Sequence, residues 1–178
     1  MSSQNFKQAT LKPQDLVVAL KISLVKEGAS TFAKLADELS ISASEVHAAV
    51  NRAELSRLVS RREGQLTANR SALREFLLHG VTYVFPPVMG ALARGMPTGV
   101  AAPPLENMFQ QAGAMPHVWP DPEGAVRGFS LCPLYPSVPE AARRDPRLYE
   151  ILALIDAHRA GAAREREAAE AMLTERYL

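Results

Sequence analysis

The segment SASEVHAAVNRA, residues 42–53, combines an apolar helical stripe with a row of hydrogen-bonding side chains. Helical spacing buries the stripe and turns the polar side chains to the opposite face. The stripe consists of Val46, Ala49, Val50 and Ala53, and the polar face carries Ser44, His47 and Asn51. Amides, hydroxyls and imidazoles hydrogen-bond to base edges, and an Asn amide pairs well with adenine. We therefore expect this face to contact double-stranded DNA.

The helix that carries this face is expected to start at Ser42, because Ser42-Ala43-Ser44-Glu45 has the S-x-x-E form of a capping box. A helix N-terminus attracts anions, so Ser42 is expected to contact a DNA phosphate. A shorter helix precedes it, with apolar residues at helical spacing from Phe32 to Leu39 and an N-cap at Ser30 or Thr31. Two helices joined by so short a turn form the geometry that places the second helix in a major groove.

The string LADELSISASEVHAAV, residues 35–50, closely resembles the helix-turn-helix of bacterial transcription regulators. The resemblance implies that Ala36 lets the two helices approach, that Ile41 fills the turn, and that Val46 and Val50 hold the recognition helix. Residue 40 is Ser where this family usually has Gly. A left-handed backbone at this position costs a residue other than glycine about 1 kcal/mol.

A basic hairpin is expected directly after the recognition helix. Residues 58–60 and 66–67 are extended candidates on either side of the string RREG, residues 61–64. Arg61 and Arg62 at its tip are expected to reach phosphates or the neighbouring minor groove, with Arg57 and Arg70 flanking them. With this hairpin, residues of about 10 to 79 resemble the winged helix-turn-helix of the MarR-like regulators.

The distribution of proline and glycine divides the chain into three parts. Eleven of the 13 prolines and seven of the 10 glycines lie between residues 80 and 139. Residues 1–79 are therefore predicted to form the winged helix-turn-helix domain, residues 80–140 a sensor or docking region, and residues 141–178 a helical pair. The predicted fold class is mainly α, with an irregular, Pro-rich middle that holds short strands.

Apolar spacing places further elements in these parts. A first helix is expected from Pro13 to Gly28, and a fourth helix is expected to end at His79-Gly80. The string VTYVF, residues 81–85, is predicted to be a short strand, and residues 121–124 to reverse the chain between two extended pieces. Two helices follow, over residues 148–155 and 164–178. They are expected either to pack on the chain's own core or to form a two-fold dimer interface, as palindromic operators require.

Charge and composition favour a soluble DNA-binding protein. The net charge is only +1, but residues 1–79 carry a net +3, whereas residues 80–140 carry −2 and residues 141–178 are neutral. DNA responds to this local basic excess. Apolar residues make up 47% and charged residues 22% of the chain, as in globular proteins. Without a secretory signal or a long apolar run, the expected location is cytoplasmic, with no membrane contact.

Signals of enzymatic chemistry are weak. A single cysteine, Cys132, precludes an internal disulfide, and the four histidines have no metal-ligand spacing. We therefore expect no enzyme activity, metal or cofactor. The leading hypothesis is a sequence-specific regulator that binds double-stranded DNA as a homodimer. The alternative is an antitoxin or other interaction module on a winged-helix scaffold, which binds a protein encoded in the same operon and regulates that operon.

Overall fold

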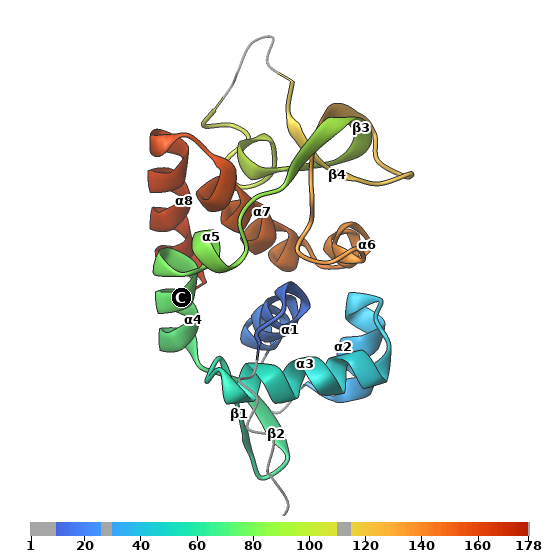
Figure 1. Ribbon diagram of the computed structural model, residues 1–178, viewed down its shortest axis with the longest axis vertical. Coiled ribbons are helices and arrows are strands. Elements are labelled where there is room, and N and C mark those ends of the chain that lie inside the picture. Colours follow the sequence, from blue (N-terminus) through green and yellow to red (C-terminus); the bar gives the residue numbers. More distant parts are fainter. Residues whose placement is uncertain (1–9, 26–29, 110–114, 178) are drawn as a thin grey trace, which may run out of the picture.

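In the computed structural model, residues 10–25, 30–109 and 115–177 are described (Figure 1). Within these ranges the chain forms eight α-helices, one short 3₁₀ helix and five strands. The strands are confined to one hairpin and one small three-stranded sheet. The mainly α fold class is therefore confirmed at this level.

The first five elements follow the order that the sequence predicts. Helices α1 (Pro13–Leu24), α2 (Phe32–Leu39) and α3 (Ala43–Leu55) precede strands β1 (Val59–Arg62) and β2 (Gln65–Ala68). Thr31, and not Ser30, caps α2, because its hydroxyl accepts from the Lys34 amide at 3.2 Å. Helix α1 packs against α3 and β2. It ends at Leu24, and the predicted end at Gly28 lies outside the described residues.

The strand predicted for residues 81–85 is wrong. Helix α4 (Arg70–His79) is followed directly by a single helical turn, α5 (Val81–Val84). The Phe85 amide donates to the Val81 carbonyl at 2.8 Å. This turn buries Val81 and Phe85, which lie four residues apart, and leaves Tyr83 and Val84 exposed. Tertiary packing of one helical face has thus overridden the β propensity of the string.

The middle sheet contains β3 (Met89–Thr98), β4 (His117–Pro120) and β5 (Val126–Leu131), with the 3₁₀ helix η1 (Gly99–Ala101) after β3. The predicted turn at residues 121–124 is present, since the Gly124 amide donates to the Asp121 carbonyl at 3.0 Å. It does not reverse the sheet direction, however, because β4 and β5 run parallel to each other and both pair antiparallel with β3. Glycine permits this close crossing: a Cβ on Gly95 would lie 2.0 Å from the Trp119 carbonyl oxygen.

Helix α7 (Pro146–Ala160) is the central element of the C-terminal part, between α6 (Val138–Arg144) and α8 (Ala163–Arg176). It packs against α1, α8, η1 and β3. Its leucine and isoleucine side chains from Leu148 to Ile155 are at most 1% exposed within the single chain. Of the two alternatives that the sequence leaves open for this face, internal packing is the observed one.

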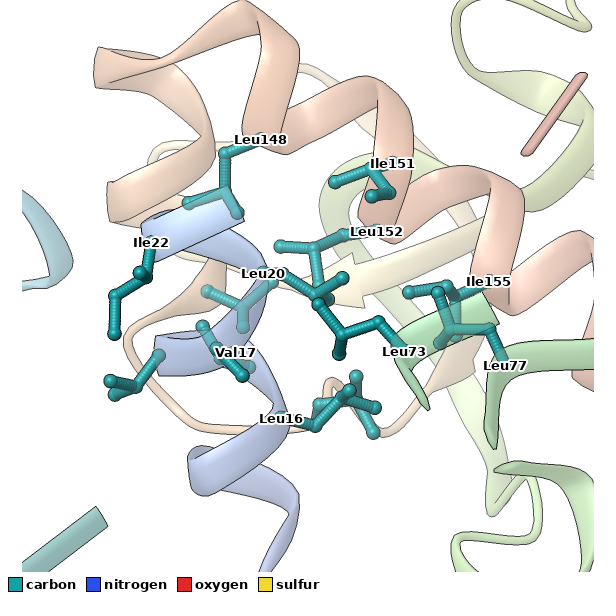
Figure 2. Close-up of a cluster of buried hydrophobic side chains, with 14 of the residues drawn as sticks. Leu16, Val17, Leu20, Ile22, Leu73, Leu77, Leu148, Ile151, Leu152 and Ile155 are labelled. Atoms are coloured by element: carbon teal, nitrogen blue, oxygen red, sulfur yellow. The ribbon is translucent and has the colours of Figure 1, made fainter. Parts of the chain in front are cut away.

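One hydrophobic core connects the three parts predicted from the sequence. Figure 2 shows side chains from three separated helices converging on it. They are Leu16, Val17, Leu20 and Ile22 of α1, Leu73 and Leu77 of α4, and Leu148, Ile151, Leu152 and Ile155 of α7. Helix α1 thus supports α3 on one side and is itself supported by α7 on another. Across the described ranges, no helix combines the length and apolarity needed to span a membrane.

Candidate nucleic-acid interface

Helix α3 is amphipathic in the way that its spacing predicts. Val46, Ala49, Val50 and Ala53 are all 0% exposed. On the opposite side, Ser44, His47 and Asn51 are exposed, and we refer to these three side chains as the α3 face. Figure 1 shows α3 near one end of the molecule, with α1 above it and the β1–β2 hairpin projecting beyond it. The α3 face therefore belongs to a helix at the edge of the fold.

A buried ion pair helps to hold α3 on α1. The Arg52 guanidinium donates to both oxygens of Asp15 at 2.8 and 2.7 Å. Asp15 is completely buried and also accepts from the Lys12 amide at 2.8 Å, which caps α1. The hydrogen bond from Arg52 to Asp15 raises the pKa of the guanidinium. Local spacing does not reveal this contact, because 37 residues separate its partners.

The capping box at the start of α3 is confirmed. The Ser42 hydroxyl accepts from the Glu45 amide, and the Glu45 carboxylate accepts from the Ser42 amide, each at 3.2 Å. Hydrogen bonds from the Tyr135 hydroxyl, at 2.8 Å, and then from Ser42 hold the pKa of Glu45 below its usual value. A phosphate at Ser42 would therefore lie beside an ionised carboxylate. This makes Ser42 a poorer phosphate site than its sequence position indicates.

Three residues predicted to contact DNA lie close to the ring of Phe32. From the sequence, Phe32 was expected only to be one of the apolar residues of α2. The Phe32 ring stacks on the His47 imidazole, with centroids 4.4 Å apart and planes at 14°. The Arg61 guanidinium lies over the same ring, 5.5 Å from its centroid. Arg61 also donates to the Asn51 side-chain oxygen at 3.2 Å. We call Phe32, His47, Asn51 and Arg61 the Phe32 cluster.

The β1–β2 hairpin is present, but Arg61 and Arg62 lie within β1 and not at its tip as predicted, because the chain turns at Glu63 and Gly64. Glu63 and Gly64 both have positive φ, +50° and +79°, as a two-residue type I′ turn requires. Val59 and Leu66 are buried on the inner side of the hairpin. Because side chains alternate along a strand, Arg61 shares their side and Arg62 lies on the other. The two adjacent arginines therefore have different surroundings.

A hollow of about 690 Å³ runs along the hairpin and the end of α3. We call it the hairpin hollow. Its lining consists of Glu54, Arg57, Val59, Ser60, Arg61, Arg62, Gln65, Thr67 and Asn69. Three guanidinium groups face one carboxylate here, and the remaining polar side chains are hydroxyls and amides. Such a lining suits the phosphodiester backbone of a nucleic acid. The structure thus brings Arg57 together with Arg61 and Arg62.

Comparison with protein-family models, curated proteins and solved structures found no match. The function must therefore be argued from the geometry of the chain itself.

Arg70 lies outside the hairpin hollow and the Phe32 cluster. Its guanidinium donates to the Tyr177 carbonyl at 2.9 Å and to the Ser23 carbonyl at 2.8 Å. These bonds tie the start of α4 to the end of α1 and to the end of α8. The two carbonyls fix the guanidinium in place, while Arg70 stays exposed and its predicted contact with DNA stays a prediction.

Residues of the C-terminal half contact α2 on the side that is remote from the hairpin. The Ser137 hydroxyl donates to the Leu39 carbonyl at 2.6 Å, and Arg144 donates to the Asp37 carbonyl at 2.8 Å. Lys21, which is buried, lies 3.1 Å from Glu38 and 2.7 Å from Asp145. These contacts leave the α3 face and the hairpin hollow uncovered. Among the described residues, no group of histidines, cysteines and carboxylates is arranged to hold a metal ion.

Proposed function

We propose that this chain is a transcription regulator that binds specific sequences in double-stranded DNA. Residues of about 10 to 79 act as a winged helix-turn-helix, with α3 as the recognition helix and the β1–β2 hairpin as the wing. The observation that carries the proposal is the position of the exposed α3 face beside the basic hairpin hollow, at one end of the molecule. An α-helix with its side chains is about 10–12 Å in diameter, which fits a major groove about 12 Å wide, and the 13 residues of α3 give it a length of about 20 Å.

Each part of this surface has a role in the proposal. Ser44 and Asn51 contact base edges, while Arg57 and Arg62 contact phosphates along the hairpin hollow. The ion pair between Asp15 and Arg52 keeps α3 in position without taking part in binding. The local net charge of +3 in residues 1–79 attracts DNA even though the whole chain is nearly neutral.

The direct test is a gel-shift titration with DNA from immediately upstream of the chain's own gene, at several salt concentrations. We expect a retarded complex that resists a shuffled competitor, with an affinity that falls as salt rises. A double Arg57→Gln/Arg62→Gln variant should bind more weakly than a double Arg127→Gln/Arg164→Gln variant. Arg127 and Arg164 are exposed on β5 and α8, so the second variant loses the same charge elsewhere. Equal binding by both variants would contradict the proposed interface.

A second candidate function is supported by the exposed apolar side chains of the middle region. Tyr83, Val88 and Met89 expose 85%, 61% and 50% of their surface. Such side chains are typical of a surface that meets another protein. The chain then acts as an antitoxin or other interaction module whose partner is encoded in the same operon. In that case the neighbouring gene product co-purifies with the chain, and Tyr83→Ser/Val88→Ser weakens that complex more than Asn51→Ala does.

A further inference from the structure

Arg61 and Arg62 look equivalent in the sequence, but the hairpin gives them different positions. Both residues line the hairpin hollow, and Arg62 pairs in register with Gln65 beside the turn. Arg61 lies opposite Leu66, a buried residue, and its guanidinium turns toward α3. The sequence predicts phosphate contacts for both residues, whereas these surroundings suit two different kinds of contact.

The Phe32 cluster holds Arg61 beside the α3 face. Its guanidinium lies 5.5 Å from the centre of the Phe32 ring and 3.2 Å from the Asn51 side-chain oxygen. A carboxylate oxygen of Glu54 lies 3.9 Å away on the same side of α3. A cation over an aromatic face is attracted by the ring quadrupole. The same ring stacks on His47, so one aromatic side chain contacts a residue of α3 and a residue of the hairpin.

We infer that Arg61 determines sequence specificity together with Asn51, and that Phe32 is the positioning residue that holds it there. This inference rests on the proposed DNA-binding function. Guanidinium groups recognise guanine by two parallel hydrogen bonds, and Asn amides recognise adenine in the same way. Two such groups in contact read neighbouring base pairs. Holding Arg61 in place before DNA arrives lowers the conformational entropy that binding costs.

A phosphate contact and a base contact can be distinguished by how DNA binding changes when each is removed. Loss of a phosphate contact weakens binding to every sequence alike and lowers the salt slope by about 0.9. Loss of a base contact instead removes discrimination at one position, by roughly 5- to 150-fold. Arg62→Ala is the matched control for Arg61→Ala, because the two residues are adjacent, exposed and of the same charge.

The experiment measures binding of each variant to a panel of upstream duplexes that differ from the parent site by one base pair. Arg62→Ala should lose affinity uniformly and lower the salt slope. Arg61→Ala should lose discrimination at one or two adjacent positions. Phe32→Leu should lose discrimination at those same positions although Arg61 is intact, and Phe32→Tyr should restore it, since it returns an aromatic face. Thermal unfolding of each variant verifies that the domain is folded.

The outcomes separate this inference from the function on which it rests. If Arg61→Ala behaves like Arg62→Ala, with uniform loss and an equal change in slope, Arg61 is a phosphate ligand and the inference is overturned while DNA binding stands. If Phe32→Leu discriminates like the parent chain, the positioning role is overturned. If the parent chain binds no duplex of the panel even at low salt, the proposed function fails and the inference fails with it.

Discussion

Ser40, which ends α2, has a backbone conformation that glycine adopts more easily. Its φ and ψ are +52° and +46°, in the left-handed region. This is the conformation expected at the position where the resemblance indicates glycine. The Ser40 hydroxyl is also buried without a hydrogen-bond partner. The turn between α2 and α3 is therefore formed at a cost in stability.

Replacing this residue by glycine is expected to stabilise the chain. Ser40→Gly should raise the free energy of unfolding by about 1 kcal/mol, because glycine meets no Cβ clash in the left-handed region. Denaturant unfolding measures the change. Ser40→Ala is the control, since it removes the unpaired hydroxyl and keeps the clash. If alanine stabilises as much as glycine, the hydroxyl and not the backbone is the cause.

Substitutions of neighbouring residues on α3 should have different effects on stability and on DNA binding. Val50→Ala should destabilise the chain by about 1–3 kcal/mol, because it opens a cavity at a fully buried position. Asn51 is exposed, so Asn51→Ala should change the free energy of unfolding by less than about 0.5 kcal/mol. The variant should nevertheless lose discrimination between DNA sequences at one base pair. A thermal melt and a gel shift on each variant test the pair. Parent-like binding by both Asn51→Ala and His47→Ala would contradict the role of α3 as a recognition helix.

At the scale of elements, the start of α7 is joined to α1 by charge. The Asp145 carboxylate caps α7 by accepting from the Arg147 and Leu148 amides at 3.0 and 3.2 Å. It also accepts from the Lys21 ammonium at 2.7 Å. Burial opposes the ionisation of Asp145, but the hydrogen bond from Lys21 and those from the two amides hold its pKa below the ordinary 3.8.

This shift predicts a loss of stability in acid. Because the folded pKa of Asp145 lies below the unfolded one, its contribution is present above pH 3.8 and is lost as the pH falls through the folded value. Lys21→Met should flatten this part of the stability curve, since it removes the ammonium that favours the carboxylate. Denaturant unfolding at a series of acidic pH values measures both chains. A Lys21→Met curve parallel to that of the parent would contradict the linkage.

At the scale of the whole molecule, the candidate interface depends on the C-terminal helices. Helix α1 packs on α3 and β2, and it also packs on α7. Leu16 and Leu20 of α1 are 0% exposed in a core that includes Leu148 and Leu152 of α7 (Figure 2). The winged helix-turn-helix proposed for residues 10–79 is therefore not covered by its own elements alone.

Truncation tests this dependence. A chain that ends at Arg144 lacks α7 and α8, and we expect it to lose cooperative unfolding or to aggregate, because the α1 surface that α7 covers becomes exposed. Circular dichroism melts and light scattering follow the two outcomes. A soluble truncated chain with a sharp thermal transition would show that the N-terminal elements fold independently.

Features that depend on local interactions can be predicted from the sequence. The capping box at Ser42, the buried stripe of Val46 and Val50, and the presence of a hairpin after α3 were all predictable. Each depends on backbone hydrogen bonds and side-chain spacing within a few residues. The helix boundaries around α2 and α3 follow from the same local rules.

Only the tertiary structure decided which distant residues meet. The pattern cannot tell that Phe32 contacts Arg61, that Arg70 is tied to Tyr177, or that Asp15 is paired with Arg52. The sequence pattern also left open whether α7 packs within the chain. The string VTYVF has only five residues, which are too few for their spacing to distinguish a helical turn from a strand. These outcomes depend on the path of the whole chain, because a contact forms only where the folded backbone brings two side chains together.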